Sequence, residues 1–355
     1  MENGRKLFEK VRQNGYDGAV LFDEVSQHWA TGFPFTDGVV IVCEKETLML
    51  TDSRYIEAAR SGVYADVRPI LFEKSAADSV AKYVKEMGIR SLAFDSGRMT
   101  VAQLRRLEKA CEGVRFEDVP ALCDELRRVK TAKEIENVRI AQSITDAAFT
   151  HICDFIRPGL TELEVAAELE YFMRKNGADG LAFETIAVSG KKSSLPHGVP
   201  GKVELTVNSF LTMDYGARYN GYCSDMTRTV VLGKADDEMK LIYNTVLQAQ
   251  TAAIAAMHAG ATGKEVDAAA RDIIKAAGYG AYFGHGTGHS LGLEIHESPN
   301  SSPRAECTFA VNQFQTVEPG IYLEGKYGVR IEDLVLVTEN GCEDLTTSKK
   351  ELIEL

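Results

Sequence analysis

The sequence predicts two domains, an α/β domain over residues 1–125 and an α+β domain over residues 126–355 that contains an internal pseudo-twofold duplication. Three observations support this fold class. The chain has 355 residues, more than one ordinary hydrophobic core requires. Strand-like and helix-like patterns alternate in the first third, which is typical of a sheet packed between helices. The remainder repeats one order of helices and acid-bearing strands at an interval of roughly 100 residues.

Composition and charge limit the classes of function. Apolar residues make up 45% of the chain and charged residues 26%, which excludes a disordered or fibrous protein. The net charge of -12 argues against nucleic acid or an anionic membrane as a partner. The first residues lack the apolar core of a signal peptide, and the seven cysteines are scattered without a Cys-x-x-Cys pair. We therefore expect a reduced, cytoplasmic protein without a disulfide framework or a thiolate zinc site.

The α/β pattern of the first domain is read from short β-branched runs and amphipathic segments. Strands are expected at 18–22, 38–43, 47–51 and 91–94. Helices are expected at 5–14, 75–86 and 101–111. A charged stretch over 124–133 is expected to connect this domain to the second one.

Two helix pairs define the duplication in the second domain. One helix is expected to run from the capping box Thr131-Ala-Lys-Glu134 to about residue 156, and another from Thr161-Glu-Leu-Glu164 to about residue 176. The design returns with a helix over about 237–258 and a helix that follows Thr262-Gly-Lys-Glu265 and ends near residue 278. The second capping boxes of the two pairs are 101 positions apart.

A histidine and two acids follow each helix pair in the same order. The first set is His197, Asp214 and Asp225, and the second set is His296, Glu318 and Glu332. Matching members are 99, 104 and 107 positions apart. We therefore expect two similar halves that face one another, with a site at their seam.

Asp214 and Asp225 flank Asn220-Gly221, the strongest short hairpin signal in the chain. They are expected on neighbouring strands, roughly diagonal to one another. Asp214 interrupts an apolar strand, where an unpaired carboxylate would be costly. Its partner is either an arginine, for which Arg218 and Arg228 are candidates, or a metal ion.

Three of the seven histidines, His285, His289 and His296, fall within twelve residues, and four glycines lie in or directly before this stretch, at 284, 286, 288 and 292. Glycine lets the backbone approach a ligand closely, and imidazole serves as a metal ligand or proton carrier near neutral pH. We interpret this cluster as functional rather than structural. Glu318 precedes a Pro-Gly turn, and Glu332 is expected on an apolar strand. An exposed hairpin explains one such acid, but it does not explain acids in the matching strands of both halves.

Four carboxylates and at least one imidazole should therefore converge at the seam. Without a cation, four adjacent carboxylates would repel one another and take up protons. Two divalent ions offset the four charges, which is the arrangement of dinuclear hydrolases. Because oxygen ligands dominate, manganese is expected first, with cobalt, iron(II) and zinc as alternatives.

Five residues, in this order and within these motifs, resemble the metal ligands of the "pita-bread" metallopeptidases: Asp214, Asp225, His289, Glu318 and Glu332. That family includes prolidase, aminopeptidase P and methionine aminopeptidase, and the resemblance covers essentially the whole chain. It implies a creatinase/prolidase-like N-terminal domain, a pita-bread (creatinase/aminopeptidase-like) catalytic domain and a homodimer.

Two motifs are similar to those of the prolidase and aminopeptidase P branch, namely Thr51-Asp-Ser-Arg-Tyr55 and the loop that contains Pro196-His197-Gly198. This likeness implies a small peptide substrate with proline in its second position. Lys192 departs from the branch, in which arginine is common at this place. Family resemblance leaves two alternatives open, a creatinase-like hydrolase and a non-catalytic binding protein of the same fold.

The resemblance also implies a mechanism in which a hydroxide held between two ions attacks the Xaa-Pro bond. Glu318 would move the proton, and His296 would stabilise the oxyanion together with one metal. A further group is expected to line the pocket or to support the ligands: His197, His285, Arg330, Asp333 and Tyr322.

Overall fold

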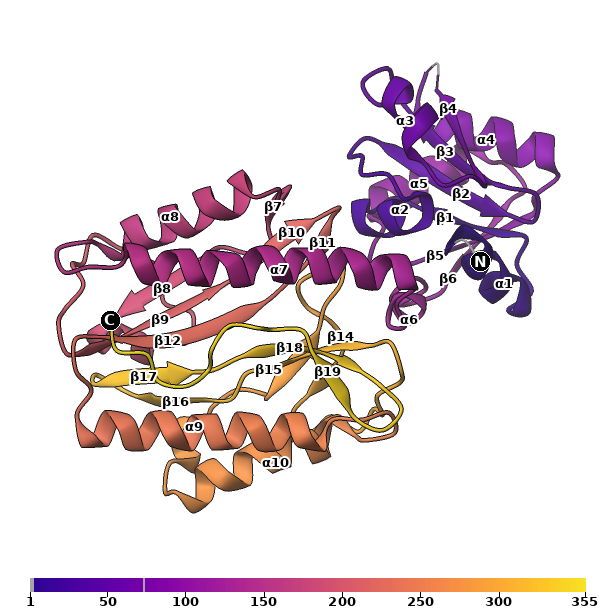
Figure 1. The fold of residues 1–355 in the computed structure, drawn as a ribbon. Coiled ribbons are helices and arrows are strands. Elements are labelled where there is room, and N and C mark those ends of the chain that lie inside the picture. Colours follow the sequence, from indigo (N-terminus) through magenta and orange to yellow (C-terminus); the bar gives the residue numbers. More distant parts are fainter. Residues whose placement is uncertain (1–2, 73) are drawn as a thin grey trace. The chain divides into compact units, whose positions relative to one another are not determined.

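The computed structural model describes residues 3–72 and 74–355, and the chain divides into two compact units between Arg127 and Arg128 (Figure 1). This division lies within the charged stretch expected to act as a connector. Among the described residues, no helix is long and apolar enough to cross a membrane.

The first unit is a mixed six-stranded sheet with the strand order β4-β3-β2-β1-β5-β6. Its strands are β1 (Gly18–Leu21), β2 (Gly38–Cys43), β3 (Thr47–Thr51), β4 (Val67–Leu71), β5 (Ser91–Phe94) and β6 (Arg115–Asp118). Its helices are α1 (Asn3–Gln13), α2 (Glu24–Thr31), α3 (Ile56–Gly62), α4 (Ala76–Met87), α5 (Val101–Ala110) and α6 (Asp124–Arg127). The sheet is the one expected from the alternating pattern.

Burial on both faces explains why β1, β2 and β3 read as continuous apolar runs. Alternate strand residues such as Ile41 and Leu48 share a core with Val80 and Val84 of α4 and with Leu107 of α5. Their sequence neighbours point to the opposite face, because side chains alternate along a strand. The sequence analysis missed α2, α3, β4 and β6, which are short and lack a continuous apolar run.

The second unit contains the two predicted helix pairs, α7 (Ala132–Phe155) with α8 (Glu162–Lys175), and α9 (Asp237–Ala256) with α10 (Gly263–Ala276). All three predicted capping boxes are formed. In each, a threonine side chain accepts from the amide three residues later, and the glutamate there accepts from the threonine amide. In Figure 1, α7 and α8 lie on one side of the strands of this unit, and α9 and α10 lie on the other.

Strands and short 3-10 helices occupy the space between the helix pairs. The first half contains β7 (Gly180–Leu181), β8 (Ile186–Ser189), η1 (Gly190–Ser194), β9 (Ser209–Tyr215), β10 (Ala217–Tyr219), β11 (Tyr222–Cys223) and β12 (Met226–Leu232). The second half contains η2 (Gly280–Tyr282), β13 (Gly288–Ser290), β14 (Glu297–Ser301), β15 (Phe314–Val317), β16 (Gly320–Leu323), β17 (Tyr327–Arg330), β18 (Asp333–Val337) and β19 (Cys342–Asp344).

The predicted Asn-Gly turn joins β10 to β11, and both of its residues adopt positive φ, at 48° and 80°. Beyond it, β9 and β12 pair antiparallel, with Asp214 opposite Thr227. Asp225 therefore lies diagonally across the ladder from Asp214, as predicted.

Each half has its own hydrophobic core, and β9 and β12 contribute to both. In β12, Val230 packs with α7 and α8, whereas Val231 packs with α9 and α10. In β9, Leu211 belongs to the first core and Phe210 to the second. By the two-residue period, Asp214 lies on the same face of β9 as Phe210 and is directed toward the second half. The paired strands therefore form the seam.

Candidate metal centre

The four predicted acids lie at this seam, and three of them sit at breaks between strands. Asp214 is the penultimate residue of β9. Asp225 lies between β11 and β12, Glu318 between β15 and β16, and Glu332 between β17 and β18. The prediction that Glu332 lies within a strand was therefore wrong. At a break the ladder is interrupted, and the backbone can turn the carboxylate toward the facing half.

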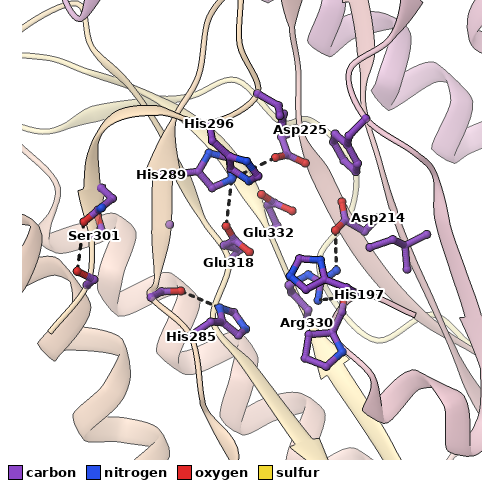
Figure 2. Close-up of a pocket in the computed structure, with 18 of the residues that line it drawn as sticks. His197, Asp214, Asp225, His285, His289, His296, Ser301, Glu318, Arg330 and Glu332 are labelled. Atoms are coloured by element: carbon purple, nitrogen blue, oxygen red, sulfur yellow. Dashed lines mark hydrogen bonds and ion pairs between the residues drawn. The ribbon is translucent and has the colours of Figure 1, made fainter. Parts of the chain in front are cut away.

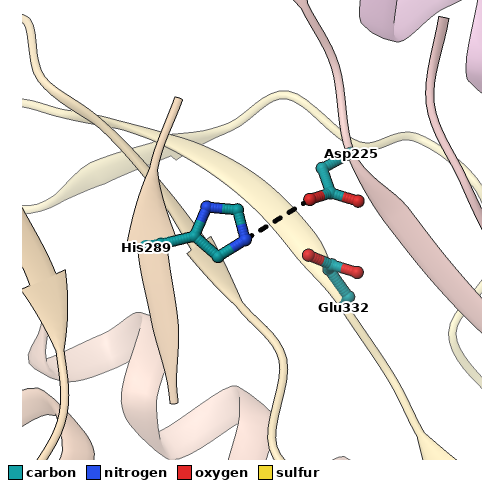
Figure 3. Close-up of side chains that lie close together, drawn as sticks. All are labelled: Asp225, His289 and Glu332. Carbon is teal, nitrogen blue, oxygen red and sulfur yellow. Dashed lines mark ion pairs between the residues drawn. The ribbon is translucent and has the colours of Figure 1, made fainter. Parts of the chain in front are cut away.

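Asp225, His289 and Glu332 form the tightest group (Figure 3), and their potential ligand atoms lie within 4.8 Å of one another. The Nε2 atom of His289 is 3.5 Å from Asp225 Oδ2 and 3.4 Å from Glu318 Oε1. Asp225 comes from the first half and the other three residues come from the second. The seam thus brings together residues that are far apart in the sequence.

The hydrogen bond of His289 determines which ring nitrogen is available. Its Nδ1 atom is 3.1 Å from the carbonyl oxygen of Ser290, so this nitrogen must donate. Burial lowers the pKa of His289, which favours the neutral ring. The Nε2 atom then carries a lone pair, and it faces two carboxylate oxygens. A cation between these atoms would convert mutually repelling acceptors into a set of ligands.

Three oxygens of the four acids lack a hydrogen-bond partner within the described part of the chain: Asp214 Oδ1, Asp225 Oδ1 and Glu332 Oε1. Burial, and then the charges of neighbouring carboxylates, raise the pKa values of Asp225 and Glu332 well above their ordinary range. Burial also raises the pKa of Glu318. Buried acceptors without donors are costly, so these residues fit a divalent cation that would occupy their lone pairs and keep them ionised.

Arg330 is the arginine partner of Asp214, and neither candidate from the sequence takes this place. The buried Arg330 donates from Nη2 to Asp214 Oδ2 over 2.6 Å. Arg218 instead approaches Asp179, and Arg228 binds Asp333. Arg330 is 116 positions from Asp214, so no local pattern could single it out.

Two threonines that the sequence analysis missed orient the ligands. Thr227 Oγ1 donates to Glu332 Oε2 over 2.7 Å and accepts from Arg330 Nε over 2.9 Å. Thr316 Oγ1 donates to Glu318 Oε1 over 3.1 Å and accepts from the His289 amide over 3.0 Å. Each threonine is two positions from an expected ligand. Since residues two positions apart share a face of a strand, this spacing is the sequence signal that could have identified them.

We expect Thr227→Val to weaken manganese binding by about 10- to 100-fold, the usual effect of losing a residue that orients a ligand. The change keeps the shape but removes both the donor to Glu332 and the acceptor for Arg330. Titration calorimetry with Mn²⁺ measures the effect. Thr245→Val is the control, since the Thr245 hydroxyl donates only to a carbonyl within α9. An unchanged dissociation constant for the Thr227 variant would contradict the orienting role.

The group opens into a cavity of about 510 Å³ that is lined by both halves (Figure 2). His197, His285 and His296 are part of this lining. The ring of His296 packs edge-on against His289, with centroids 4.4 Å apart. The apolar part of the lining consists of Phe183, Ile186, Pro196 and Ile295, of which only Pro196 belongs to a motif noted in the sequence. A cavity of this size and mixed polarity suits a small peptide.

His285 is held by a chain of hydrogen bonds. Its Nδ1 atom is 2.8 Å from the Gly286 carbonyl oxygen, and its Nε2 atom is 2.9 Å from the Tyr322 hydroxyl. Arg330 Nη1 donates to the same hydroxyl oxygen over 2.8 Å. Because Nδ1 must donate to the carbonyl, the hydroxyl of Tyr322 donates to Nε2. Both nitrogens of His285 are engaged, so this residue is suited to positioning rather than to proton transfer.

Asp333 is not part of the pocket lining. Its fully buried carboxylate accepts from Arg228 over 2.6 Å, from Gln250 over 2.6 Å, and from Lys350. Arg228 also donates to the backbone carbonyl of Glu332. Asp333 therefore supports Glu332 through Arg228 and the backbone.

Comparison with known proteins identifies relatives of both units. The model of the family described as "Metallopeptidase family M24" matches residues 136–339, and that of the "Creatinase/Prolidase N-terminal domain" matches residues 5–129. The chain is 40% identical over 355 residues to an uncharacterised peptidase of Bacillus subtilis, covering 100% of this chain and 99% of the relative.

Two solved structures share the fold over the full length. One is described as an Xaa-Pro dipeptidase from Bacillus anthracis, with a TM-score of 0.95 and 43% identity, covering 100% of this chain and 99% of the other. Another is described as an X-Pro aminopeptidase from Thermotoga maritima, with a TM-score of 0.92 and 38% identity, covering 98% of this chain and 100% of the other.

Proposed function

Because the chain belongs to metallopeptidase family M24, with a creatinase/prolidase-type N-terminal domain, we propose that it hydrolyses the bond between an N-terminal residue and proline. The fold class and the family resemblance expected from the sequence are confirmed. One observation carries the proposal. The Nε2 atom of His289 and three carboxylate oxygens without a hydrogen-bond partner among the described residues converge at a cavity of about 510 Å³, and a divalent cation would satisfy them together while keeping the carboxylates ionised.

The residues proposed to hold two divalent ions are Asp214, Asp225, His289, Glu318 and Glu332. When bound, the ions supply positive charge that activates water and polarises the scissile carbonyl. The preponderance of oxygen ligands supports manganese as the first choice, ahead of cobalt, zinc and iron. The four carboxylates among these five residues carry four negative charges, which two divalent ions would neutralise.

Glu318 is the residue we propose for proton transfer. Burial raises the pKa of its carboxyl, and such a shift toward the working pH suits a group that first accepts and then returns a proton. It would take the proton of the attacking water and deliver it to the departing proline nitrogen. Thr316, which donates to Glu318 Oε1, keeps the carboxylate in place for both steps.

His296 and His197 are proposed to act on the substrate. Partial burial lowers the pKa of His296, so its ring is neutral and has one N–H to donate to the developing oxyanion. No hydrogen bond fixes the His197 side chain among the described residues, which leaves its imidazole available to the substrate near the leaving group. Arg330 and Tyr322 fix the pocket lining at His285, because Arg330 donates to the Tyr322 hydroxyl and that hydroxyl donates to His285.

Preference for proline is supported by the apolar part of the lining. A prolyl bond is a tertiary amide without an N–H, so a site cannot recognise it by accepting that proton and must rely on shape. Pro196 and Ile186 line the cavity near Asp214, and Phe183 and Ile295 extend the apolar surface. The two solved relatives, described as an Xaa-Pro dipeptidase and an X-Pro aminopeptidase, are consistent with this preference. We also propose a homodimer, on the family resemblance, which light scattering would test.

Release of the N-terminal residue from Xaa-Pro, Xaa-Pro-Xaa and matched Xaa-Ala peptides tests the function. Cleavage is expected to require Mn²⁺, to stop on chelation, and to favour proline over alanine by about tenfold or more. The relative rates on the two proline peptides distinguish a dipeptidase from an aminopeptidase. If folded, metal-loaded protein cleaved none of these peptides, the peptidase proposal would fail, and a creatinase-like hydrolase or a binding protein would replace it.

A further inference from the structure

Glu162, the first residue of α8, is a buried carboxylate outside the metal centre. Its side chain is 0% exposed, and both of its oxygens are used. Oε1 accepts from the amide of Ser189 over 2.8 Å and from the hydroxyl of the same residue over 3.3 Å. Oε2 accepts from Lys192 Nζ over 2.6 Å and from the amide of Gly201 over 3.0 Å.

These donors lie at both ends of one segment, residues 189–201. Ser189 ends β8, Lys192 lies in η1, and Gly201 lies where the chain leaves the pocket again. The backbone of α8 adds two further bonds, from the Glu162 amide to the Val203 carbonyl and from the Leu163 amide to the Gly201 carbonyl. The carboxylate of Glu162 thus joins the two ends of this segment to one another, and the two backbone bonds attach its second end to α8.

His197 lies between the two anchored ends of this segment, in the part that reaches the catalytic cavity. Pro196 and His197 line the catalytic cavity, and the Pro196 carbonyl accepts from Arg330 Nη1 over 3.3 Å. Since no hydrogen bond holds the His197 ring within the described residues, its place depends on the backbone of this loop. The backbone in turn depends on the anchors at its base.

Gly201 allows the close approach that the clamp needs. A Cβ atom at this position would lie 3.1 Å from Lys192 Nζ and 3.7 Å from Glu162 Oε2. A side chain there would crowd the ammonium against the carboxylate. Gly198, which follows His197, packs closely as well, because a Cβ atom there would lie 2.8 Å from a methyl carbon of Val188.

We propose that Glu162 is a positioning residue whose carboxylate clamps both ends of segment 189–201 and thereby sets the position of His197 in the catalytic cavity. The proposal rests on the proposed peptidase function for its kinetic consequence. Lys192 supplies the cation that lets this carboxylate remain buried and ionised. This gives a role to the lysine that departs from the arginine common in the branch.

Glu162→Gln tests the clamp. The glutamine amide replaces one carboxylate oxygen by an NH₂ group, which faces two hydrogen-bond donors and cannot accept from them. We expect kcat for an Xaa-Pro peptide to fall by about 10- to 100-fold, the effect of a misplaced group near the reacting bond, with KM and bound manganese nearly unchanged. Glu164→Gln is the matched control. Glu164 lies two residues further along α8 and accepts only within its own exposed capping box. Its loss should alter stability without altering kcat.

A double-mutant cycle separates positioning from a general loss of structure. If Glu162 acts through His197, Glu162→Gln should change kcat by less than about twofold in a His197→Ala background. The same 10- to 100-fold loss in both backgrounds would overturn the proposal. Lys192→Met, at a residue whose side chain is 27% exposed, provides a second and milder variant, and it should show the same dependence on His197.

Hydrogen exchange tests the clamp without any substrate. The Ser189 and Gly201 amides should exchange at least tenfold faster in Glu162→Gln than in Glu164→Gln or in the wild type. Equal exchange in the three proteins would overturn the clamp. A wild type that cleaves no peptide would instead overturn the proposed function, and the exchange result would still decide the clamp.

Discussion

Asp225→Asn is expected to lower the bound metal and the peptidase activity together, each by more than about 100-fold, the upper range for a residue that merely orients a ligand. Asp225 is buried and belongs to the group of potential ligands with His289 and Glu332, and its Oδ1 atom has no hydrogen-bond partner among the described residues. The amide has the same shape but no negative charge, and its NH₂ would point a donor at the cation. Metal content by mass spectrometry and initial rates on an Xaa-Pro peptide measure the two effects.

Asp272→Asn serves as the control for this variant. Asp272 is an exposed aspartate on α10, so both metal content and activity should remain at the wild-type level. Full activity in Asp225→Asn would show that the metal assignment is wrong. Loss of activity with full metal content would remove Asp225 from the ligand set while leaving it a role in the reaction.

Arg228→Met is expected to lower the free energy of unfolding by about 3–5 kcal/mol, the range for removing one partner of a buried ion pair. The Arg228 side chain is 1% exposed and donates to Asp333 over 2.6 Å. It also donates to the carbonyl oxygens of Ser348 and Lys349 over 2.8 and 3.0 Å. Methionine fills a similar volume but removes the donor to Asp333 Oδ1 and to these two carbonyl oxygens, while Gln250 and Lys350 still donate to Asp333 Oδ2. Urea denaturation followed by circular dichroism measures the change.

Arg218→Met provides a matched control, since Arg218 lies on β10 and its ion pair with Asp179 is about half exposed, at 45% and 46%. Exposed pairs contribute about 0–1 kcal/mol, so the loss of stability should be small. Comparable losses in the two variants would mean that the buried network around Asp333 is not what stabilises this region.

Much of the fold was predictable because its signals are local. The capping boxes at Thr131, Thr161 and Thr262 depend on residues three positions apart, and all three helices begin there. The Asn220-Gly221 turn and the two-residue strand period placed Asp214 correctly on a strand and Asp225 correctly diagonal to it, although Asp225 itself lies just before β12 rather than on a strand. The segments that were missed, such as α3 and β6, are short: α3 buries only Ile56 and Ala59, and β6 has no buried residue and is held by its pairing with β5, so neither has a strong local pattern.

The candidate site divides in the same way. Its acids could be expected because their order repeats between the halves, and His289 because it lies in the glycine-rich histidine cluster and matches the family motif. Arg330 was expected to support the ligands, but its pairing with Asp214 and the role of Thr227 could not be, since Arg330 reaches Asp214 across 116 positions and Thr227 reaches Glu332 across 105. Contacts of this kind depend on how the halves pack, which no local pattern records. The interruption between β17 and β18 at Glu332, where the chain passes from one sheet to another, likewise has no signal in the apolar sequence around it.

The shared use of β12 by two hydrophobic cores has a consequence for the order of folding. Val231 of β12 packs against residues from α9 to β18. Until these residues have been synthesised, that face of β12 is exposed on the growing chain. Closing contacts across such sequence distances is entropically slow, so the seam is completed late. A metal ion that needs Asp225 and Glu332 together can therefore bind only the finished fold. Binding of the proposed divalent ions would then draw the last folding equilibrium toward completion, and the supply of those ions during synthesis would affect the yield of native protein as well as its activity.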